Sequence, residues 1–170
     1  MVKLRTLQHS DASKMALMLN QKSLWDNMRD NMPYPYTETD AVYFINLSIE
    51  SKAGINFAIL YKNDFCSVIG VKPQTDVHRK SVEIGYWIGQ AYWNKGIATQ
   101  AVKLMTQWVF EHLNVNRIFA RVFAFNVASQ KVLLKNHYRQ EATLKQAVYK
   151  NGIFVDEFIF AKLKPENDIY

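Results

Sequence analysis

The chain has 170 residues, of which 49% are hydrophobic, 14% aromatic and 21% charged, and its formal net charge is +6. This length suits a single domain, residues 1–170, and six Gly and four Pro argue against a fibrous or disordered chain. No apolar run is long enough for a membrane span, and the first residues lack the apolar stretch of a secretory signal. The lone Cys66 excludes an internal disulfide and a cysteine-based zinc site, so we expect a cytoplasmic protein.

Hydrophobic periodicity divides the chain into short strands and amphipathic helices. Strands are predicted over Val2–Leu7, Ile55–Tyr61, Phe65–Val71, Val82–Ile88, Arg117–Phe125, Tyr138–Leu144 and Phe154–Leu163. Helices are predicted from Ser10 onward and over Glu38–Lys52, Gly96–His112 and Ala128–Asn136. In the third helix, Ala101, Leu104, Met105 and Trp108 are expected to face inward. The order β-α-α-β-β-β-α-β-α-β-β predicts one α/β domain with a mixed sheet.

Positive charge is concentrated in the second half of the chain. Between Lys95 and Lys150 there are nine basic and two acidic residues, a net charge of +7. Such a concentration suits an anionic partner, which is a nucleic acid, a membrane surface or a phosphorylated cofactor, but it is equally typical of a solvated basic face. The charge pattern alone does not distinguish these three partners from one another or from a solvated face.

The segment Val82–Ala101 reads as a strand, a short loop, a glycine and a helix. A glycine at the start of a helix lets the backbone approach a ligand closely, and the free amide groups there attract anions. The spacing fits neither a P-loop nor a dinucleotide-binding fingerprint. Residues Asn94–Thr99 are therefore expected to hold a phosphate or pyrophosphate, the alternative being a purely structural role for Gly96.

Trp93-Asn94-Lys95-Gly96-Ile97-Ala98 resembles the acetyl-coenzyme A loop Q/R-x-x-G-x-G/A of the GNAT N-acetyltransferase superfamily, with Trp93 departing at the first position. Further segments resemble its ribosomal-protein N-acetyltransferase (RimJ/RimL-like) branch, namely Pro33–Thr37 with Asp40-Ala41 and Phe44-Ile45, and Asn126–Ser129 with Lys135–Tyr138 and Val155–Glu157. The resemblance implies an N-acetyltransferase that moves acetyl from acetyl-CoA to a primary amine by direct attack, without a metal. It also implies a mixed, mostly antiparallel sheet that is splayed at the cofactor site.

For the cofactor, the resemblance implies that backbone groups of Tyr86, Trp87 and Ile88 pair with the pantetheine arm as an added strand would. The Ile88 amide would polarise the thioester carbonyl. The complete expected cofactor set is Tyr86, Trp87, Ile88, Trp93, Asn94, Lys95, Gly96, Ile97, Ala98, Thr99, Asn126, Ser129 and Lys135. As an alternative, Asn126 and Ser129 form a turn and a helix cap, while Lys135, with Lys131 on the same helix face, is solvated.

Direct transfer needs a neutral amine, a polarised thioester and a proton for the leaving thiolate. Glu83, which shares a strand face with Gly85 and Trp87, is the expected base. A structural carboxylate paired with a nearby basic group is the alternative role for Glu83, and Asp156 and Glu157 are the alternative bases.

The proton donor is less well defined by the sequence. The tyrosine that many relatives use as the acid falls at Leu133 here, so Ser129 is the candidate donor. Val148 stands where some relatives that acetylate ribosomal proteins carry a carboxylate, which argues against a ribosomal acceptor.

The acceptor pocket is expected in the N-terminal third, from Trp25, Arg29, Tyr34 and Tyr36, unless these residues only close the sheet. The acceptor is then a protein or peptide N-terminus or a small-molecule amine. One alternative is a coenzyme A-binding domain without catalysis. Another is a basic nucleic-acid-binding module. Phe123 and Phe125 argue against this module, because their pattern suits a buried strand. The sequence leaves the oligomeric state open, a homodimer included.

Overall fold

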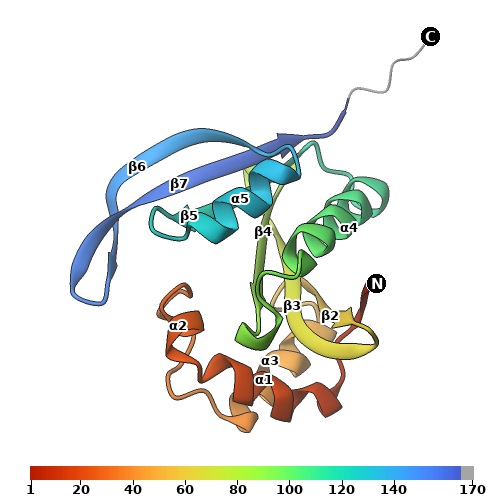
Figure 1. Cartoon of the computed structure of the whole chain (residues 1–170). Coiled ribbons are helices and arrows are strands. Elements are labelled where there is room, and N and C mark those ends of the chain that lie inside the picture. Colours follow the sequence, from red (N-terminus) through yellow and green to blue (C-terminus); the bar gives the residue numbers. More distant parts are fainter. Residues whose placement is uncertain (166–170) are drawn as a thin grey trace.

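Segments of alternating or continuous apolar residues form the strands, and segments with three- to four-residue apolar spacing form the helices. The computed structural model describes residues 1–165 (Figure 1). Its strands are β1 (Val2–Thr6), β2 (Ile55–Tyr61), β3 (Asp64–Pro73), β4 (Ser81–Ile88), β5 (Arg117–Phe123), β6 (Arg139–Lys150) and β7 (Ile153–Leu163). Its α-helices are α1 (Ala12–Leu19), α2 (Lys22–Trp25), α3 (Glu38–Ile49), α4 (Ile97–His112) and α5 (Val127–Lys135). Short 3₁₀ turns are η1 (His9–Asp11), η2 (Asp76–His78) and η3 (Gln90–Tyr92).

The seven strands that residues 1–165 form make one open sheet in the order β1-β2-β3-β4-β5-β7-β6. Neighbouring strands are antiparallel, except that β4 and β5 run parallel. The β6–β7 hairpin is long and reaches back toward α2 (Figure 1). The predicted fold class, a mixed and mostly antiparallel sheet flanked by helices, is confirmed.

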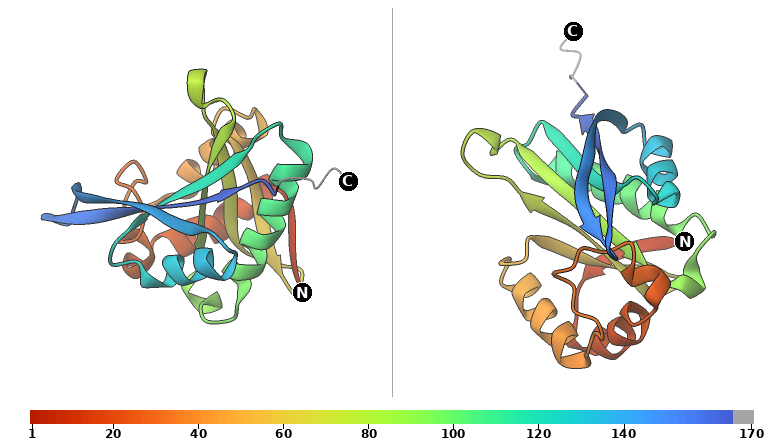
Figure 2. Two further views of the ribbon diagram at one scale, coloured as in Figure 1. Left: turned by 90° about the horizontal axis from the view of Figure 1, so that it is seen from above. Right: turned by 90° about the vertical axis from the view of Figure 1, so that its left-hand side faces the viewer.

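Helices cover both faces of the sheet (Figure 2). On one face, α1 and α3 bury an apolar core that includes Met15, Ile45 and Trp87. On the other face, α4 buries a core that includes Met105 and Ile84. Because successive side chains of β4 point to opposite faces, this strand contributes to both cores. Its side-chain directions are therefore fixed by packing on each side.

β4 and β5 separate after a short parallel ladder. The paired residues are Ser81, Val82 and Glu83 with Arg117, Ile118 and Phe119. Beyond this ladder, β4 stays paired with β3 as far as Ile88, whereas β5 pairs with β7 along its whole length. The sheet therefore opens into a gap along the second half of β4, and the splay implied by the family resemblance is confirmed.

Two predicted element ends need correction. α3 begins behind a capping box formed by Thr37 and Asp40, as its sequence favours, but it ends at Ile49 rather than at Lys52. β6 was expected to end at Leu144 and continues to Lys150. The register of β6 against β7 shifts between Leu144 and Val148. Because this irregularity interrupts the alternation of apolar and polar residues, the sequence pattern did not predict the second half of the strand.

Two predicted core residues lie at the surface instead. Leu104, expected on the inner face of α4, is exposed, while its neighbour Met105 is fully buried. Phe125 lies beyond the end of β5 and is 45% exposed, whereas Phe123 is buried as expected. The strand prediction failed at Phe125 because the chain turns at the last residues before α5, where alternation no longer reports on burial.

Candidate active site

A left-handed glycine starts α4. Gly96 has φ +72°, a conformation that other residues adopt at a steric cost, and no atom lies within 4 Å of the position where its Cβ would be. No side chain caps this helix end. The amide of Gln100 makes the first intrahelical bond, to the Gly96 carbonyl, so the amides of the preceding turn are available to an outside acceptor. Open space, free amides and the positive end of the helix dipole suit a pyrophosphate.

The backbone of β4 presents amide groups to the gap beside it. The Gly89 amide donates to the Cys66 carbonyl on β3. Because successive amides of a strand point to opposite sides, those of Ile88 and Tyr86 point away from β3 and toward the gap. The Ile88 carbonyl on that side accepts a 2.7 Å hydrogen bond from the indole nitrogen of Trp93. The residue that departs from the family loop pattern therefore anchors the loop to the strand.

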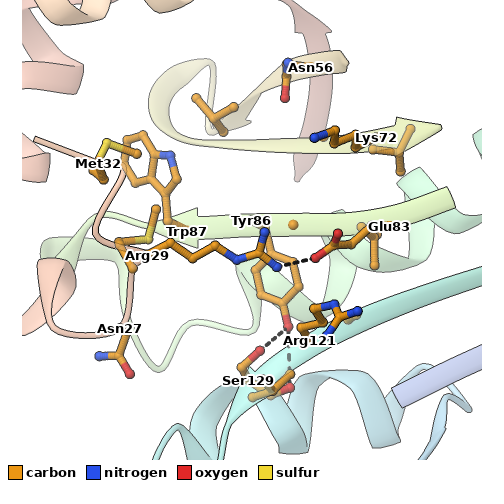
Figure 3. A pocket seen from close by; sticks show the side chains of 18 of the residues that line it. Asn27, Arg29, Met32, Asn56, Lys72, Glu83, Tyr86, Trp87, Arg121 and Ser129 are labelled. Atoms are coloured by element: carbon orange, nitrogen blue, oxygen red, sulfur yellow. Dashed lines mark hydrogen bonds and ion pairs between the residues drawn. The ribbon is translucent and has the colours of Figure 1, made fainter. Parts of the chain in front are cut away.

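The start of α5 lies across the gap from Tyr86. The Asn126 side chain accepts a 3.1 Å hydrogen bond from the Ser129 amide and so caps the helix. The Ser129 hydroxyl lies 2.9 Å from the Tyr86 hydroxyl (Figure 3). Burial raises the pKa of the Tyr86 phenol above its ordinary value, so the phenol keeps its proton at neutral pH. Two hydroxyl groups thus form a protonated pair beside the open edge of β4.

These elements enclose a cavity of about 730 Å³, the larger cavity below. All thirteen residues of the expected cofactor set line it: Tyr86, Trp87, Ile88, Trp93, Asn94, Lys95, Gly96, Ile97, Ala98, Thr99, Asn126, Ser129 and Lys135. Lys131 lines it as well. Residues that the sequence reasoning did not assign to this site are Leu24, Asn27, Met28, Tyr92, Phe125, Val127, Ala128 and Val132. The exposed position of Phe125 is explained by its place in this wall.

A second cavity of about 350 Å³, the smaller cavity below, adjoins the first (Figure 3). Both cavities are lined by Asn27, Met28, Tyr86, Trp87, Asn126 and Ser129. The carboxylate of Glu83 lies in the smaller cavity and forms an ion pair with the guanidinium of Arg29. The side chain of Glu83 is 18% exposed and that of Arg29 is 55% exposed. The two cavities therefore meet at the hydroxyl pair, with a carboxylate on one side and the glycine turn on the other.

The four residues expected around the acceptor lie in three different places. Arg29 lines the smaller cavity. Trp25 and Tyr34 pack against each other with tilted rings whose centroids are 5.1 Å apart, and they line neither cavity. Tyr36 is only 4% exposed and belongs to the core beneath α1 and α3, so it supports the loop from below rather than facing a ligand.

The two alternative carboxylates have other partners. Hydrogen bonds from Lys145 and from the Gln146 amide hold the pKa of Asp156 below its usual value, and this residue stabilises the irregularity in β6. Glu157 is buried and paired at 3.0 Å with Arg121, which lines the smaller cavity. Neither carboxylate lines a cavity, so Glu83 is the one acid among the described residues that line the two cavities.

Sequence reasoning missed the phenol of Tyr86, which it considered only for its backbone, and two cations of the smaller cavity, Lys72 and Arg121. Lys72 lies directly opposite Glu83 on β3. Arg121 lies two residues beyond Phe119, the partner of Glu83 on β5. Strand alternation within β5 predicts that Arg121 shares a face with Phe119. It does not predict that this face lies beside Glu83, because that depends on the pairing register of β4 and β5.

Comparison with known proteins gives concordant results. A family model described as an acetyltransferase (GNAT) domain matches residues 2–139. The chain is 34% identical over 139 residues to the N-acetyltransferase p20 of Bacillus licheniformis, across 78% of this chain and 77% of p20. It is 32% identical over 118 residues to the N-acetyltransferase YoaA of Bacillus subtilis, across 68% of this chain and 66% of YoaA, just under two thirds of that relative.

Among solved structures, the fold is similar to that of RimL, a ribosomal L7/L12 alpha-N-protein acetyltransferase in complex with coenzyme A. The TM-score is 0.83 at 22% identity, and the match covers 95% of this chain and 93% of the other. Within residues 1–165, no helix is long and apolar enough to cross a membrane, and no group of three or more His, Cys, Asp or Glu residues is placed to hold a metal ion. The chain belongs to the GNAT acetyltransferase family, whose domain model matches residues 2–139.

Proposed function

We propose that the protein transfers the acetyl group of acetyl-coenzyme A to a primary amine by direct attack of that amine. One observation carries the proposal: the larger and the smaller cavity meet at Tyr86, Trp87, Asn126 and Ser129. A thioester held in the larger cavity would there face an amine held in the smaller one. Proximity of this kind is a large part of what an acyltransferase contributes to rate.

The larger cavity suits the cosubstrate in each of its parts. The amides of Tyr86 and Ile88 would bind the pantetheine arm as a neighbouring strand does, and the Ile88 amide would polarise the thioester carbonyl. The turn at Gly96 and the first turn of α4 would bind the pyrophosphate. Lys131 and Lys135 lie at the same wall and would pair with phosphate charge. When bound, acetyl-coenzyme A supplies the activated acetyl group.

The junction supplies the acid, and the smaller cavity supplies the base. Glu83, directly or through a water molecule, would take the ammonium proton of the bound amine and pass it to water. It would then take the second proton, which the nitrogen loses once its bond to carbon has formed. As the nitrogen–carbon bond forms and the carbon–sulfur bond breaks, the sulfur takes a proton from the hydroxyl of Ser129. The Tyr86 hydroxyl then gives Ser129 a new proton through their 2.9 Å contact. Tyr86 recovers its proton from water, and Glu83 returns one to water, so both residues end the cycle unchanged.

The acceptor class follows from the size and place of the smaller cavity. RimL, according to its description, acetylates the N-terminus of a ribosomal protein. We propose a peptide N-terminus or a small-molecule amine as the acceptor here, because a cavity of about 350 Å³ admits one residue-sized group. Val148, in place of a carboxylate, gives no support for a ribosomal protein in particular. Location in the cytoplasm stays a prediction.

Substitution of the base tests the proposal. Glu83→Gln keeps the size of the side chain and should leave acetyl-coenzyme A affinity unchanged in calorimetry, because Glu83 does not line the larger cavity. It should lower kcat about ten- to a thousandfold, as expected from the loss of one general base. The loss should shrink at high pH, where the amine deprotonates without help.

Glu141→Gln is the matched control, because Glu141 is also paired with an arginine, Arg117, but lines neither cavity. This variant should keep the parent rate. If Glu83→Gln turns over like the parent at every pH, Glu83 has a structural role and the base lies elsewhere. If the parent protein binds acetyl-coenzyme A but acetylates no amine in a broad panel, the alternative holds, which is a coenzyme A-binding domain without catalysis.

A further inference from the structure

The carboxylate proposed as the base is already paired with a cation of the same chain. The guanidinium of Arg29, from the loop after α2, points across the smaller cavity to Glu83 (Figure 3). A protonated amine that enters this cavity would bind the same carboxylate, of which Arg29 contacts only the oxygen Oε1. An amine that displaces Arg29 from this oxygen leaves a guanidinium that is 55% exposed, and its positive charge beside the cavity favours a new anionic partner.

The remaining charges of the smaller cavity cannot receive the displaced guanidinium. Among the described residues that line it, Glu83 is the only acid, whereas Arg29, Lys72 and Arg121 are basic. Arg121 is already paired with Glu157, which lies behind it on β7. Once an amine occupies Glu83, the cavity therefore holds a surplus of positive charge. That surplus attracts an anionic group and repels a second cation.

The loop that carries Arg29 is held in place on its outer side. Lys150, at the end of β6, donates a 2.6 Å hydrogen bond to Asp30 and lies 3.5 Å from the centre of a Trp25 ring. Asn151, in the hairpin turn, donates to Asp26 at 2.9 Å. With the backbone anchored at these points, the long Arg29 side chain is the part that is free to change partner.

Building on the proposed function, we propose that the acceptor is an anionic amine, whose amino group lies a few bonds from a carboxylate or phosphate. On binding, the amino group takes the place of Arg29 on Glu83, and Arg29 pairs with the anionic group. A guanidinium suits this exchange because it binds carboxylate and phosphate through two parallel hydrogen bonds. The same exchange keeps Glu83 neutralised by Arg29 until a suitable acceptor arrives.

The test compares acceptors of different charge on a common scaffold, with the full-length protein and saturating acetyl-coenzyme A. Aspartyl-, asparaginyl- and lysyl-alanine amide share an α-amine, and phosphoseryl- and seryl-alanine amide separate phosphate from carboxylate. γ-Aminobutyrate and γ-aminobutyramide form the corresponding small-molecule pair. We expect kcat/KM for the anionic member to exceed that of its neutral partner about ten- to a hundredfold, the contribution of one charge-assisted contact. The lysyl amide should be the poorest peptide acceptor.

Two variants attribute the preference to Arg29. Arg29→Gln should reduce the anionic-over-neutral ratio to about one, and Arg29→Glu should invert it in favour of the lysyl amide. Lys22→Gln is the matched control: the Lys22 side chain is 56% exposed and ion-paired, like that of Arg29, but lines neither cavity. This control should keep the parent ratio. Arg29 lies on the surface, so all three variants should keep the parent melting temperature.

The possible outcomes separate this inference from the proposed function. If neutral or cationic acceptors react as well as anionic ones, the inference is wrong while the acetyltransferase function stands. If no acceptor reacts, the proposed function is contradicted. The inference is then decided by calorimetry of the aspartyl and asparaginyl amides with the coenzyme A complex, where equal affinities would overturn it. A ratio that survives in Arg29→Gln assigns the preference to another cation and overturns the role of Arg29.

Discussion

The larger cavity takes its shape from backbone, whereas the smaller cavity is lined by side chains from distant segments. The open edge of β4, the glycine turn and the first turn of α4 lie between residues 86 and 99 of one continuous stretch. Arg29 and Glu83, which define the chemistry of the smaller cavity, are 54 residues apart. A site made of backbone suits a ligand that is common to all members of a family, such as the cosubstrate. A site made of side chains can change by substitution and suits a ligand that differs between members, such as the acceptor. Four predictions test this difference in construction.

The largest expected effect comes from removing the backbone cradle. Gly96→Val places a branched side chain in the open space before α4, at a left-handed φ. Acetyl-coenzyme A affinity should fall about a hundredfold or more in calorimetry, because at least two hydrogen bonds to a charged group are lost. Binding to the smaller cavity, measured with an acceptor amine alone, should remain.

Gly152→Val provides the control for backbone strain. Gly152 lies in the β6–β7 turn with φ +82°, and its Cβ would likewise meet no atom within 4 Å. Both variants should show a similar drop in melting temperature, while only Gly96→Val should lose the cosubstrate. Equal affinities in the two variants would contradict the assignment of the turn at Gly96.

The junction between the cavities should respond less strongly. Tyr86→Phe keeps the packed ring and removes the hydroxyl that contacts Ser129. We expect kcat to fall about ten- to a hundredfold, the lower part of the range for one acid–base group. Ser129→Ala should lose about as much, and the double variant should lose little more than either alone, because the two hydroxyls act in series.

The pH profile adds a second measurement at the same pair. Because burial raises the pKa of Tyr86, the phenol stays protonated beyond the ordinary phenol value of about 10. The kcat of the parent protein should therefore rise with pH as the amine deprotonates, with no descending limb below about pH 10. A descending limb between neutral pH and that value, absent from Tyr86→Phe, would show that Tyr86 ionises readily and contradict its burial.

The smallest effect is expected from the charged wall of the larger cavity. The double substitution Lys131→Ala with Lys135→Ala should weaken acetyl-coenzyme A binding about three- to tenfold at low ionic strength, and less in high salt, because exposed charges are screened. Lys103→Ala, at an exposed position of α4 outside both cavities, is the control. Affinity that does not depend on salt would assign both lysines to an ordinary solvated face.

The same contrast explains which parts could be predicted from the sequence. The turn at Gly96 is formed by local backbone, so a short motif indicated it, and the order of strands and helices along the chain followed from periodicity. Arg29 was expected near the acceptor from its position and lines the smaller cavity, but its ion pair with Glu83 depends on how a loop folds over a sheet. Tyr36 was expected at the ligand because aromatic residues serve equally well in pocket walls and cores, and only packing decides between them.

The three-residue ladder between β4 and β5 has a mechanical consequence. It is the only strand pairing, within residues 1–165, that joins the half-sheet β1–β4 to the half-sheet β5–β7. A pantetheine arm lying in the gap would hold the two half-sheets together where their strands are not paired. Part of the stability of the sheet would then come from a bound ligand and not from the chain itself. The rigidity of the protein should then increase with the concentration of acetyl-coenzyme A in the cell.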